Sequence, residues 1–303
     1  MNKVVIIGCG NVGMSYAYSM VIHGSNIDEL VLIDVNKEKA EGEALDLSHA
    51  MSYAPKNFKV YVGDYSDCNN ATIICICAGK GQNPGETRTD LIHKNYEVFK
   101  SIIDNINKTN FNGIYLVATN PLDIMTYITY KLSGFSPNKV IGSGTTLDSA
   151  RLRYLIGEKL DINPKNIHGF VIGEHGDTEF VPWNNVLIGL DKADKFLTKK
   201  DMIEIEKEVV GSAYEIINKK GNTCYGIGMS LLKITNAILY NQNSIMTVSA
   251  YNKEHDCYFA IPTILNKNGV KKSLFITLSQ EDEERLTKSL NEIKANKSKI
   301  FDK

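Results

Sequence analysis

The sequence GCGNVG at residues 8–13 constrains the fold of this chain more than any other segment. It follows a short β-branched run, Val4 to Ile7, and it precedes small and apolar residues at helical spacing. A G-x-G-x-x-G turn between a strand and a helix is typical of a dinucleotide-binding fold. Gly8 permits the tight turn, Gly10 lets a pyrophosphate approach the backbone, and Gly13 lets the helix pack closely.

An acidic residue at the end of the next expected strand strengthens this interpretation. Asp34 lies about 20 residues beyond Gly13, where an acid binds the ribose hydroxyls of an adenosine. The same carboxylate repels a 2′-phosphate, so NAD is favoured over NADP. The ordinary alternative, a tight turn followed by a solvated strand end, does not require an acid at this distance.

Short apolar runs alternate with helical patterns in the first half of the chain, and this alternation predicts a parallel sheet. We expect an α/β fold, with a doubly wound parallel sheet (a Rossmann domain) at residues 1–142 and a mixed α/β catalytic domain at residues 143–303. The first half has expected strands at 4–7, 30–33, 59–62, 73–77 and 114–118, and expected helices at 12–22 and 37–48.

The second half mixes long helical patterns with a predicted hairpin. Asn268-Gly269 is a hairpin signal, and Ser279 is expected to cap a last helix with Leu286, Leu290 and Ile293 on one face. The remaining expectations are helices at 148–160 and 199–218 and strands at 167–172, 245–251, 258–265 and 273–278.

Charge and cysteine content exclude several classes of protein. Lys and Arg total 34 against 35 Asp and Glu, a balance that indicates neither nucleic acid nor an anionic membrane as partner. No stretch is long and apolar enough to span a bilayer. A chain of this length does not need disulfides to be stable, so we expect its cysteines to be reduced thiols and the protein to be cytoplasmic. The six cysteines are Cys9, Cys68, Cys75, Cys77, Cys224 and Cys257.

The segment IGEHGD at residues 172–177 places a histidine between glycines and carboxylates in an apolar passage. Histidine exchanges protons near neutral pH, and flanking glycines let the backbone approach a substrate, so His175 is a candidate acid/base residue. Metal binding by Glu174, His175, Asp177 and His168 is the rival interpretation. No HExxH or comparable ligand spacing is present, so we expect no metal.

Two further segments provide candidate substrate groups. The polar, glycine-rich residues 79–88 follow an expected strand, so this loop borders the ligand crevice and ends at Arg88, which could polarise a carbonyl. Asp148 and Arg151 share one helix face. A surface ion pair is their ordinary explanation, but an arginine fork also suits a substrate carboxylate, and an aspartate commonly orients a catalytic imidazole.

With these motifs in view, the chain resembles the lactate and malate dehydrogenase family, and its bacterial L-lactate members in particular. The resemblance extends over nearly the whole sequence. It is carried by GCGNVG at 8–13, AGKGQNPGETR at 78–88, VATNPLDI at 117–124, GSGTTLDSARLR at 142–153 and IGEHGD at 172–177.

The resemblance implies a catalytic role for each candidate. His175 exchanges a proton with the substrate oxygen while Asp148 orients the imidazole, Arg151 holds the substrate carboxylate, and Arg88 polarises the carbonyl. Asn120 lies near both substrate and nicotinamide. The other implied substrate residues are Gln82, at the position where lactate enzymes carry Gln and malate enzymes carry Arg, and Thr223 in the pocket.

The resemblance also implies a coenzyme, an assembly and an effector. NAD would contact Gly8, Gly10, Val12, Gly13, Asp34, Lys39, Tyr65, Gly79, Ser101, Asn120 and Ser143. The implied assembly is a homotetramer, or a dimer that assembles further. Arg153 and His168 match positions at which bacterial members bind fructose 1,6-bisphosphate between subunits. The implied reaction interconverts pyruvate and L-lactate in glycolysis and fermentation. The alternatives are a malate or other 2-hydroxy acid dehydrogenase and a non-catalytic NAD-binding protein on the same fold.

Overall fold

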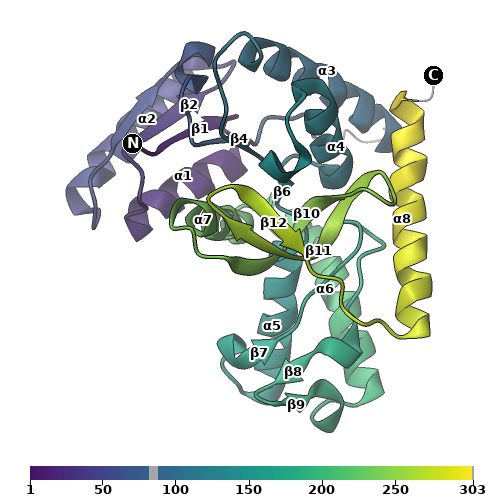
Figure 1. Ribbon diagram of the computed structural model, residues 1–303. Coiled ribbons are helices and arrows are strands. Elements are labelled where there is room, and N and C mark those ends of the chain that lie inside the picture. The colour runs from purple at the N-terminus through teal and green to yellow at the C-terminus, as the bar shows by residue number, and fades with distance from the viewer. Residues whose placement is uncertain (82–87, 302–303) are drawn as a thin grey trace.

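The computed structural model describes residues 1–81 and 88–301, with the backbone alone at residue 88. A nine-stranded sheet with the order β12-β11-β10-β6-β5-β4-β1-β2-β3 forms its upper lobe, as Figure 1 shows. A smaller lower lobe contains a three-stranded sheet, β7-β8-β9. The mixed α/β fold with a large parallel sheet is therefore confirmed.

The parallel strands β1 to β5 agree with the expected strands to within one residue at each end, and β6 is a further strand that the pattern did not predict. Apart from β3 at the edge, these strands are largely buried, which explains their continuous apolar sequences. The strands are β1 (Lys3–Ile7), β2 (Glu29–Ile33), β3 (Lys59–Val62), β4 (Ile73–Ile76), β5 (Ile114–Val117) and β6 (Val140–Gly142). The helices between them are α1 (Asn11–His23), α2 (Lys37–Ala50), α3 (Arg88–Ile106) and α4 (Leu122–Ser133).

Three antiparallel strands from the second half extend the same sheet. They are β10 (Ser244–Asn252), β11 (Cys257–Asn266) and β12 (Gly269–Ser273). Ser249 of β10 pairs with Gly142 of β6, so the sheet runs without a break across the expected domain boundary. The predicted hairpin is confirmed: β11 and β12 are joined by a turn at Lys267 and Asn268, and Gly269, which begins β12 and pairs with Asn266, has a φ of 90°.

The prediction of a strand at 273–278 is wrong. Strand β12 ends at Ser273, which pairs with Thr263. The next partner along β11 would be Pro262, whose nitrogen carries no hydrogen to continue the ladder. The N–H of Leu274 still donates to the carbonyl of Pro262 at 2.7 Å, and Phe275 beyond it is exposed. The chain then leaves the sheet for the last helix.

The lower lobe and the covering helices complete the fold. The lower lobe has β7 (Ile167–His168), β8 (Leu187–Ile188), β9 (Asp191–Lys192), α5 (Thr146–Leu160) and α6 (Lys199–Lys220). Helix α7 (Tyr225–Leu239) packs on α1, and α8 (Gln280–Phe301) runs along one side of the molecule beside both lobes (Figure 1). Ser279 accepts from the N–H of Asp282, which confirms the predicted cap of α8.

The expected strand at 167–172 is mostly absent. Only Ile167 and His168 pair as a strand, with β8. Val171 instead donates its N–H to Oγ of Ser149 and accepts from Oγ1 of Thr145, both on or beside α5. Side chains on or beside α5 therefore take the place of a neighbouring strand. These hydrogen bonds hold the segment that leads to His175 against the start of α5.

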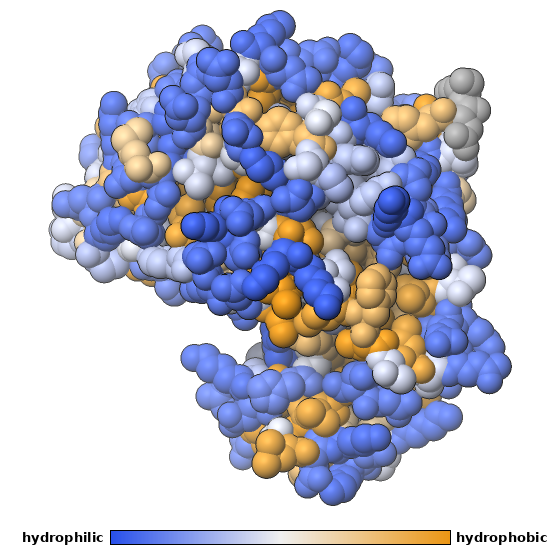
Figure 2. Space-filling model, viewed as in Figure 1, coloured by the Kyte–Doolittle hydropathy of each residue, from blue (hydrophilic) through white to orange (hydrophobic). Residues whose placement is uncertain are grey.

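The core has one layer on each face of the large sheet. One layer joins α1, α2 and α7 to the sheet through side chains such as Tyr16, Leu30 and Leu231. The opposite layer joins α3, α4 and α8 through Phe99, Ile128 and other apolar residues that include Leu290 and Ile293. Figure 2 shows a mainly hydrophilic face with apolar residues gathered where the two lobes meet. In the described chain no helix is both apolar and long enough to cross a membrane.

Candidate active site

The glycine turn between β1 and α1 has the shape that a dinucleotide requires. Gly8 has a φ of 105°, and a side chain there would collide with the backbone of Ala78. A Cβ on Gly13 would lie 2.1 Å from the carbonyl oxygen of Gly8, whereas a Cβ on Gly10 would meet nothing within 4 Å. The open space at Gly10, next to the positive end of α1, fits a coenzyme pyrophosphate.

Asp34 lies beside this turn, directly after β2. Its Oδ2 accepts from the N–H of Cys9 at 2.6 Å, and its Oδ1 accepts from the N–H of Asn36 at 2.9 Å. Lys39 is close enough to this turn for its charge to lower the pKa of Cys9, although burial and the charge of Asp34 raise that pKa to about 12. The residues of the turn therefore fit NAD, as the sequence predicts.

We expect Gly13→Ala to weaken NADH binding by about 5- to 150-fold. The added methyl group overlaps the carbonyl oxygen of Gly8, so α1 must move away from β1, and such overpacking costs about 1–3 kcal/mol. Fluorescence titration with NADH measures the effect. Gly42→Ala, on the open face of α2, is the matched control, because a Cβ there meets nothing within 4 Å. Equal affinity in both variants would contradict this account of the turn.

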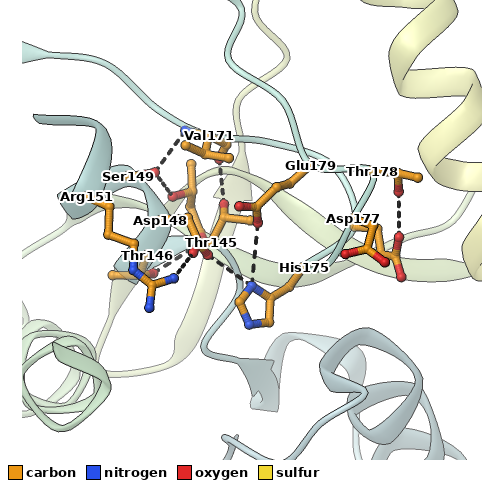
Figure 3. A network of polar contacts seen from close by, with 12 residues as sticks. Thr145, Thr146, Asp148, Ser149, Arg151, Val171, His175, Asp177, Thr178 and Glu179 are labelled. Carbon is orange, nitrogen blue, oxygen red and sulfur yellow. Dashed lines mark hydrogen bonds and ion pairs between the residues drawn. The ribbon is translucent and has the colours of Figure 1, made fainter. Parts of the chain in front are cut away.

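On the substrate side, α5 presents a buried carboxylate to two cationic groups. Oδ1 of Asp148 lies 2.7 Å from Nη1 of Arg151, and Oδ2 lies 2.9 Å from Nδ1 of His175 (Figure 3). The Asp148 side chain is only 2 % exposed, so the pair with Arg151 is not the surface ion pair that its spacing alone allows. The structure thus brings Asp148, Arg151 and His175 together as the sequence predicts.

This arrangement favours the protonated form of His175. Burial lowers the pKa of the imidazole, but the charge and hydrogen bond of Asp148, with a smaller contribution from Glu179, more than compensate and raise it well above the usual value. The pKa of Asp148 is lowered, because the attraction of His175 and Arg151 outweighs the effect of burial. With 24 % of its side chain exposed, His175 can still reach a ligand. The site is therefore equipped to deliver a proton to a bound molecule.

Backbone contacts hold the candidate histidine and the nearby loop in place. Asp123 of α4 accepts from the backbone N–H of His175 at 2.8 Å. Buried Asn95 of α3 accepts from the N–H of Lys80 at 2.7 Å and donates to the carbonyl of Asn120 at 2.9 Å. Neither Asp123 nor Asn95 was predicted from the sequence. Asp123 lies within the VATNPLDI motif, whereas nothing in the sequence marks Asn95.

The other predicted residues have varied locations. Ser143 is buried after β6, and Gly79 packs on Thr119 at the end of β4. Asn120 is exposed after β5, Thr223 is half-buried between α6 and α7, and Tyr65 is half-buried after β3.

Ser101 lies on the exposed face of α3, and no described contact joins it to the glycine turn. Gln82 and the Arg88 side chain lie outside the described residues.

The rival metal set does not assemble. Glu174 accepts from Thr178, Asp177 accepts from Tyr214, and His168 is exposed on β7. Within the described ranges, the one close group of ligand-type side chains is Asp148, His175 and Glu179. The guanidinium of Arg151 already pairs with Asp148 of this group, so we assign Asp148 and His175 to proton transfer.

The fold and site define an NAD-dependent oxidoreductase with a Rossmann coenzyme domain. The lactate/malate dehydrogenase NAD-binding model matches residues 2–142, and the α/β C-terminal model of the same family matches residues 145–303. The chain therefore belongs to the lactate/malate dehydrogenase family.

Named relatives and solved structures agree with this assignment. L-lactate dehydrogenase 2 of Bacillus anthracis is 47% identical over 311 residues, which cover 99% of each chain. L-lactate dehydrogenase 1 of Bacillus cereus is 48% identical with the same coverage. A lactate dehydrogenase from a Medee basin deep-sea metagenome library has a TM-score of 0.96 at 42% identity, with 98% of each chain covered.

A minor L-lactate dehydrogenase of Enterococcus mundtii provides a comparison of two states. Its ligands-bound form has a TM-score of 0.96, with 99% of this chain and 98% of that chain covered at 39% identity. Its ligands-unbound form has a TM-score of 0.90 at the same identity, with 99% and 97% covered. The described conformation of this chain is thus more similar to the ligand-bound form.

Proposed function

We propose that this chain is an L-lactate dehydrogenase that interconverts pyruvate and L-lactate. The observation that carries the proposal is the buried carboxylate of Asp148 between the guanidinium of Arg151 and Nδ1 of His175. In this arrangement Arg151 can bind the carboxylate of a 2-oxo acid, and His175 can protonate the carbonyl oxygen of the same substrate. The names of the relatives support the choice of L-lactate.

The residues divide the reaction between binding and proton transfer. The guanidinium of Arg151 has five N–H donors. One of them donates to Asp148, and the others remain for a substrate carboxylate. His175 donates from Nε2 to the carbonyl oxygen, while Asp148 keeps Nδ1 protonated and stabilises the imidazolium. Bound NADH supplies the hydride to the carbonyl carbon. We assign polarisation of the carbonyl to Arg88, and further substrate contacts to Gln82, Asn120 and Thr223.

Most of the proposed coenzyme contacts follow the carboxyl ends of the parallel strands, whereas Lys39 lies on α2 and Ser101 on α3. Gly10 and Asp34 provide the central pair, with space for the pyrophosphate and a carboxylate for the ribose. The whole proposed set is Gly8, Gly10, Val12, Gly13, Asp34, Lys39, Tyr65, Gly79, Ser101, Asn120 and Ser143.

An assay with pyruvate and NADH tests the function directly. We expect oxidation of NADH at a rate that depends on pyruvate, with L-lactate as the product when it is resolved on a chiral column. The reverse reaction should accept L-lactate and leave D-lactate unused. Absence of any turnover, with normal NADH binding, would instead favour a non-catalytic NAD-binding protein.

We also propose a cytoplasmic homotetramer that serves glycolysis and fermentation. Several large apolar side chains remain exposed on helices of both lobes, including Tyr18 on α1, Leu45 on α2 and Ile203 on α6. Exposed side chains of this size on helices are candidates for a subunit contact where they lie together. Sedimentation analysis tests the assembly.

Fructose 1,6-bisphosphate is expected to activate the enzyme through Arg153 and His168. Burial lowers the pKa of Arg153, and burial together with the charge of Arg153 lowers the pKa of Lys233 on α7. Arg153 and Lys233 are thus neighbouring cations, which favours an anion at Arg153, whereas the role of His168 rests on the resemblance alone. Titration with the bisphosphate at low pyruvate should raise the rate in the parent and leave Arg153→Gln unchanged. A flat response of the parent at neutral pH would remove this proposal.

A further inference from the structure

A second carboxyl group, Glu179, faces the catalytic histidine from within its own loop. Its Oε2 lies 3.7 Å from Nδ1 of His175, and its side chain is only 4 % exposed (Figure 3). It comes from the segment that pairs with Ile172 through Phe180, so the backbone fixes its position. The buried position next to an acid/base residue requires an explanation, because an unpaired buried carboxylate is costly.

Proton geometry gives that explanation. Nδ1 of an imidazole carries a single hydrogen, and Asp148 at 2.9 Å is closer to it than Glu179 at 3.7 Å. Within the described residues, Oε2 of Glu179 makes no well-aligned hydrogen bond, and its contact with Nδ1 of His175 is an ion-pair distance that is longer than the one from Asp148. A carboxyl group without a donor avoids the cost of burial by keeping its own proton. Burial and the charge of Asp148 raise the pKa of Glu179 to about 8, against the opposing effect of His175 and Arg151.

The charges around Glu179 come from several elements. Asp148 and Arg151 face it from α5, and His175 faces it from the same loop. Glu179 also lines a groove of about 960 Å³. Other residues that line this groove are Glu206 and Lys207 of α6 and Arg285 of α8. Arg285 pairs with Glu206 and lies 4.7 Å from the ring centre of Phe180, so its charge is already compensated. The remaining groove carboxylates are Asp177, Asp194, Glu281 and Asp282, and Lys199 is the other groove cation.

We propose that Glu179 is a positioning residue that sets the charge balance of His175. In neutral solution it is a neutral acid and leaves Asp148 as the single counter-ion of the imidazolium. In alkaline solution it ionises and adds a second negative charge beside Nδ1. This charge keeps His175 protonated at higher pH, so pyruvate reduction persists further into the alkaline range and lactate oxidation begins later. The kinetic consequence rests on the proposed function, whereas the titration itself does not.

The kinetic test compares the parent with Glu179→Gln, which keeps the shape of the protonated acid. We expect kcat for pyruvate at neutral pH to stay within about threefold. We expect the alkaline limit of pyruvate reduction to move to lower pH by about one unit or more, since a charge within about 4–6 Å shifts a pKa by 1–3 units. The onset of L-lactate oxidation should move by the same amount. Asp194→Asn, which removes an exposed carboxylate from the same groove, should leave both limits in place.

A titration without substrate separates this inference from the proposed function. The imidazole nitrogens of His175, assigned by the loss of their NMR signals in His175→Asn, should titrate in two steps in the parent, because the two groups are coupled. They should titrate in one step in Glu179→Gln. A single step in the parent, or equal alkaline limits in the parent and Glu179→Gln, would overturn the inference even if the enzyme is active.

Discussion

His175→Asn should reduce kcat for pyruvate by about 10²–10⁴-fold, the usual contribution of general acid/base catalysis, while NADH still binds. Asparagine keeps a polar side chain at this position but cannot release a proton. The coenzyme turn is built from β1, α1 and Asp34, so its geometry does not depend on the imidazole. Steady-state rates and fluorescence titration with NADH measure the two effects separately.

The same substitution at an exposed histidine provides the control. His23, in the last turn of α1, is solvent-exposed, and His23→Asn should retain the parent rate.

Asp148→Asn tests the electrostatic role of Asp148, because loss of its carboxylate lowers the pKa of His175. Reduction uses the imidazolium and is lost as pH rises through that pKa, so its alkaline limit should move to lower pH. Near-normal turnover of His175→Asn would disprove the proton relay.

Gln82→Arg should change the specificity ratio between oxaloacetate and pyruvate on the order of 10³-fold or more. Oxaloacetate places a methylene carboxylate where pyruvate has a methyl group. A neutral amide gives that carboxylate no counter-charge, and burial of an unpaired anion is costly. Arginine supplies a fork for it, so kcat/KM should rise for oxaloacetate and fall for pyruvate. Gln82 lies outside the described residues, so this expectation rests on the sequence.

Parallel measurements for Gln82→Asn separate charge from side-chain size. The shorter amide keeps a neutral group at the loop position, so any loss should affect pyruvate without a gain for oxaloacetate. A solvated residue without substrate contact would give the same ratio in the parent and both variants. That result would count against the role of Gln82 and weaken the lactate assignment.

The sequence predicted the parts of the fold that local rules determine. Apolar runs such as Ile73 to Ile76 are buried strands, and the spacing of Gly8, Gly10 and Gly13 defined a turn whose close contacts the structure reproduces. The end of β12 was missed, because it depends on Pro262 in the neighbouring strand, and a single-strand pattern contains no information about that partner. The connection of β10 to β6 was missed for the same reason.

The site shows a similar division. His175, Asp148 and Arg151 were predictable, because each belongs to a recognisable motif and their chemistry is complementary. Glu179 and Asn95 were not, since their roles come from burial and from neighbours distant in sequence. An ordinary glutamate acquires an unusual environment only when α5 and the histidine loop meet.

We expect this site to reduce pyruvate in preference to other 2-oxo acids. The most direct measurement is kcat/KM with NADH for pyruvate, oxaloacetate and a branched 2-oxo acid under one set of conditions, since this ratio reports discrimination directly. Pyruvate should give the highest value. A higher value for oxaloacetate would make the chain a malate dehydrogenase, and a higher value for the branched acid would indicate another 2-hydroxy acid dehydrogenase.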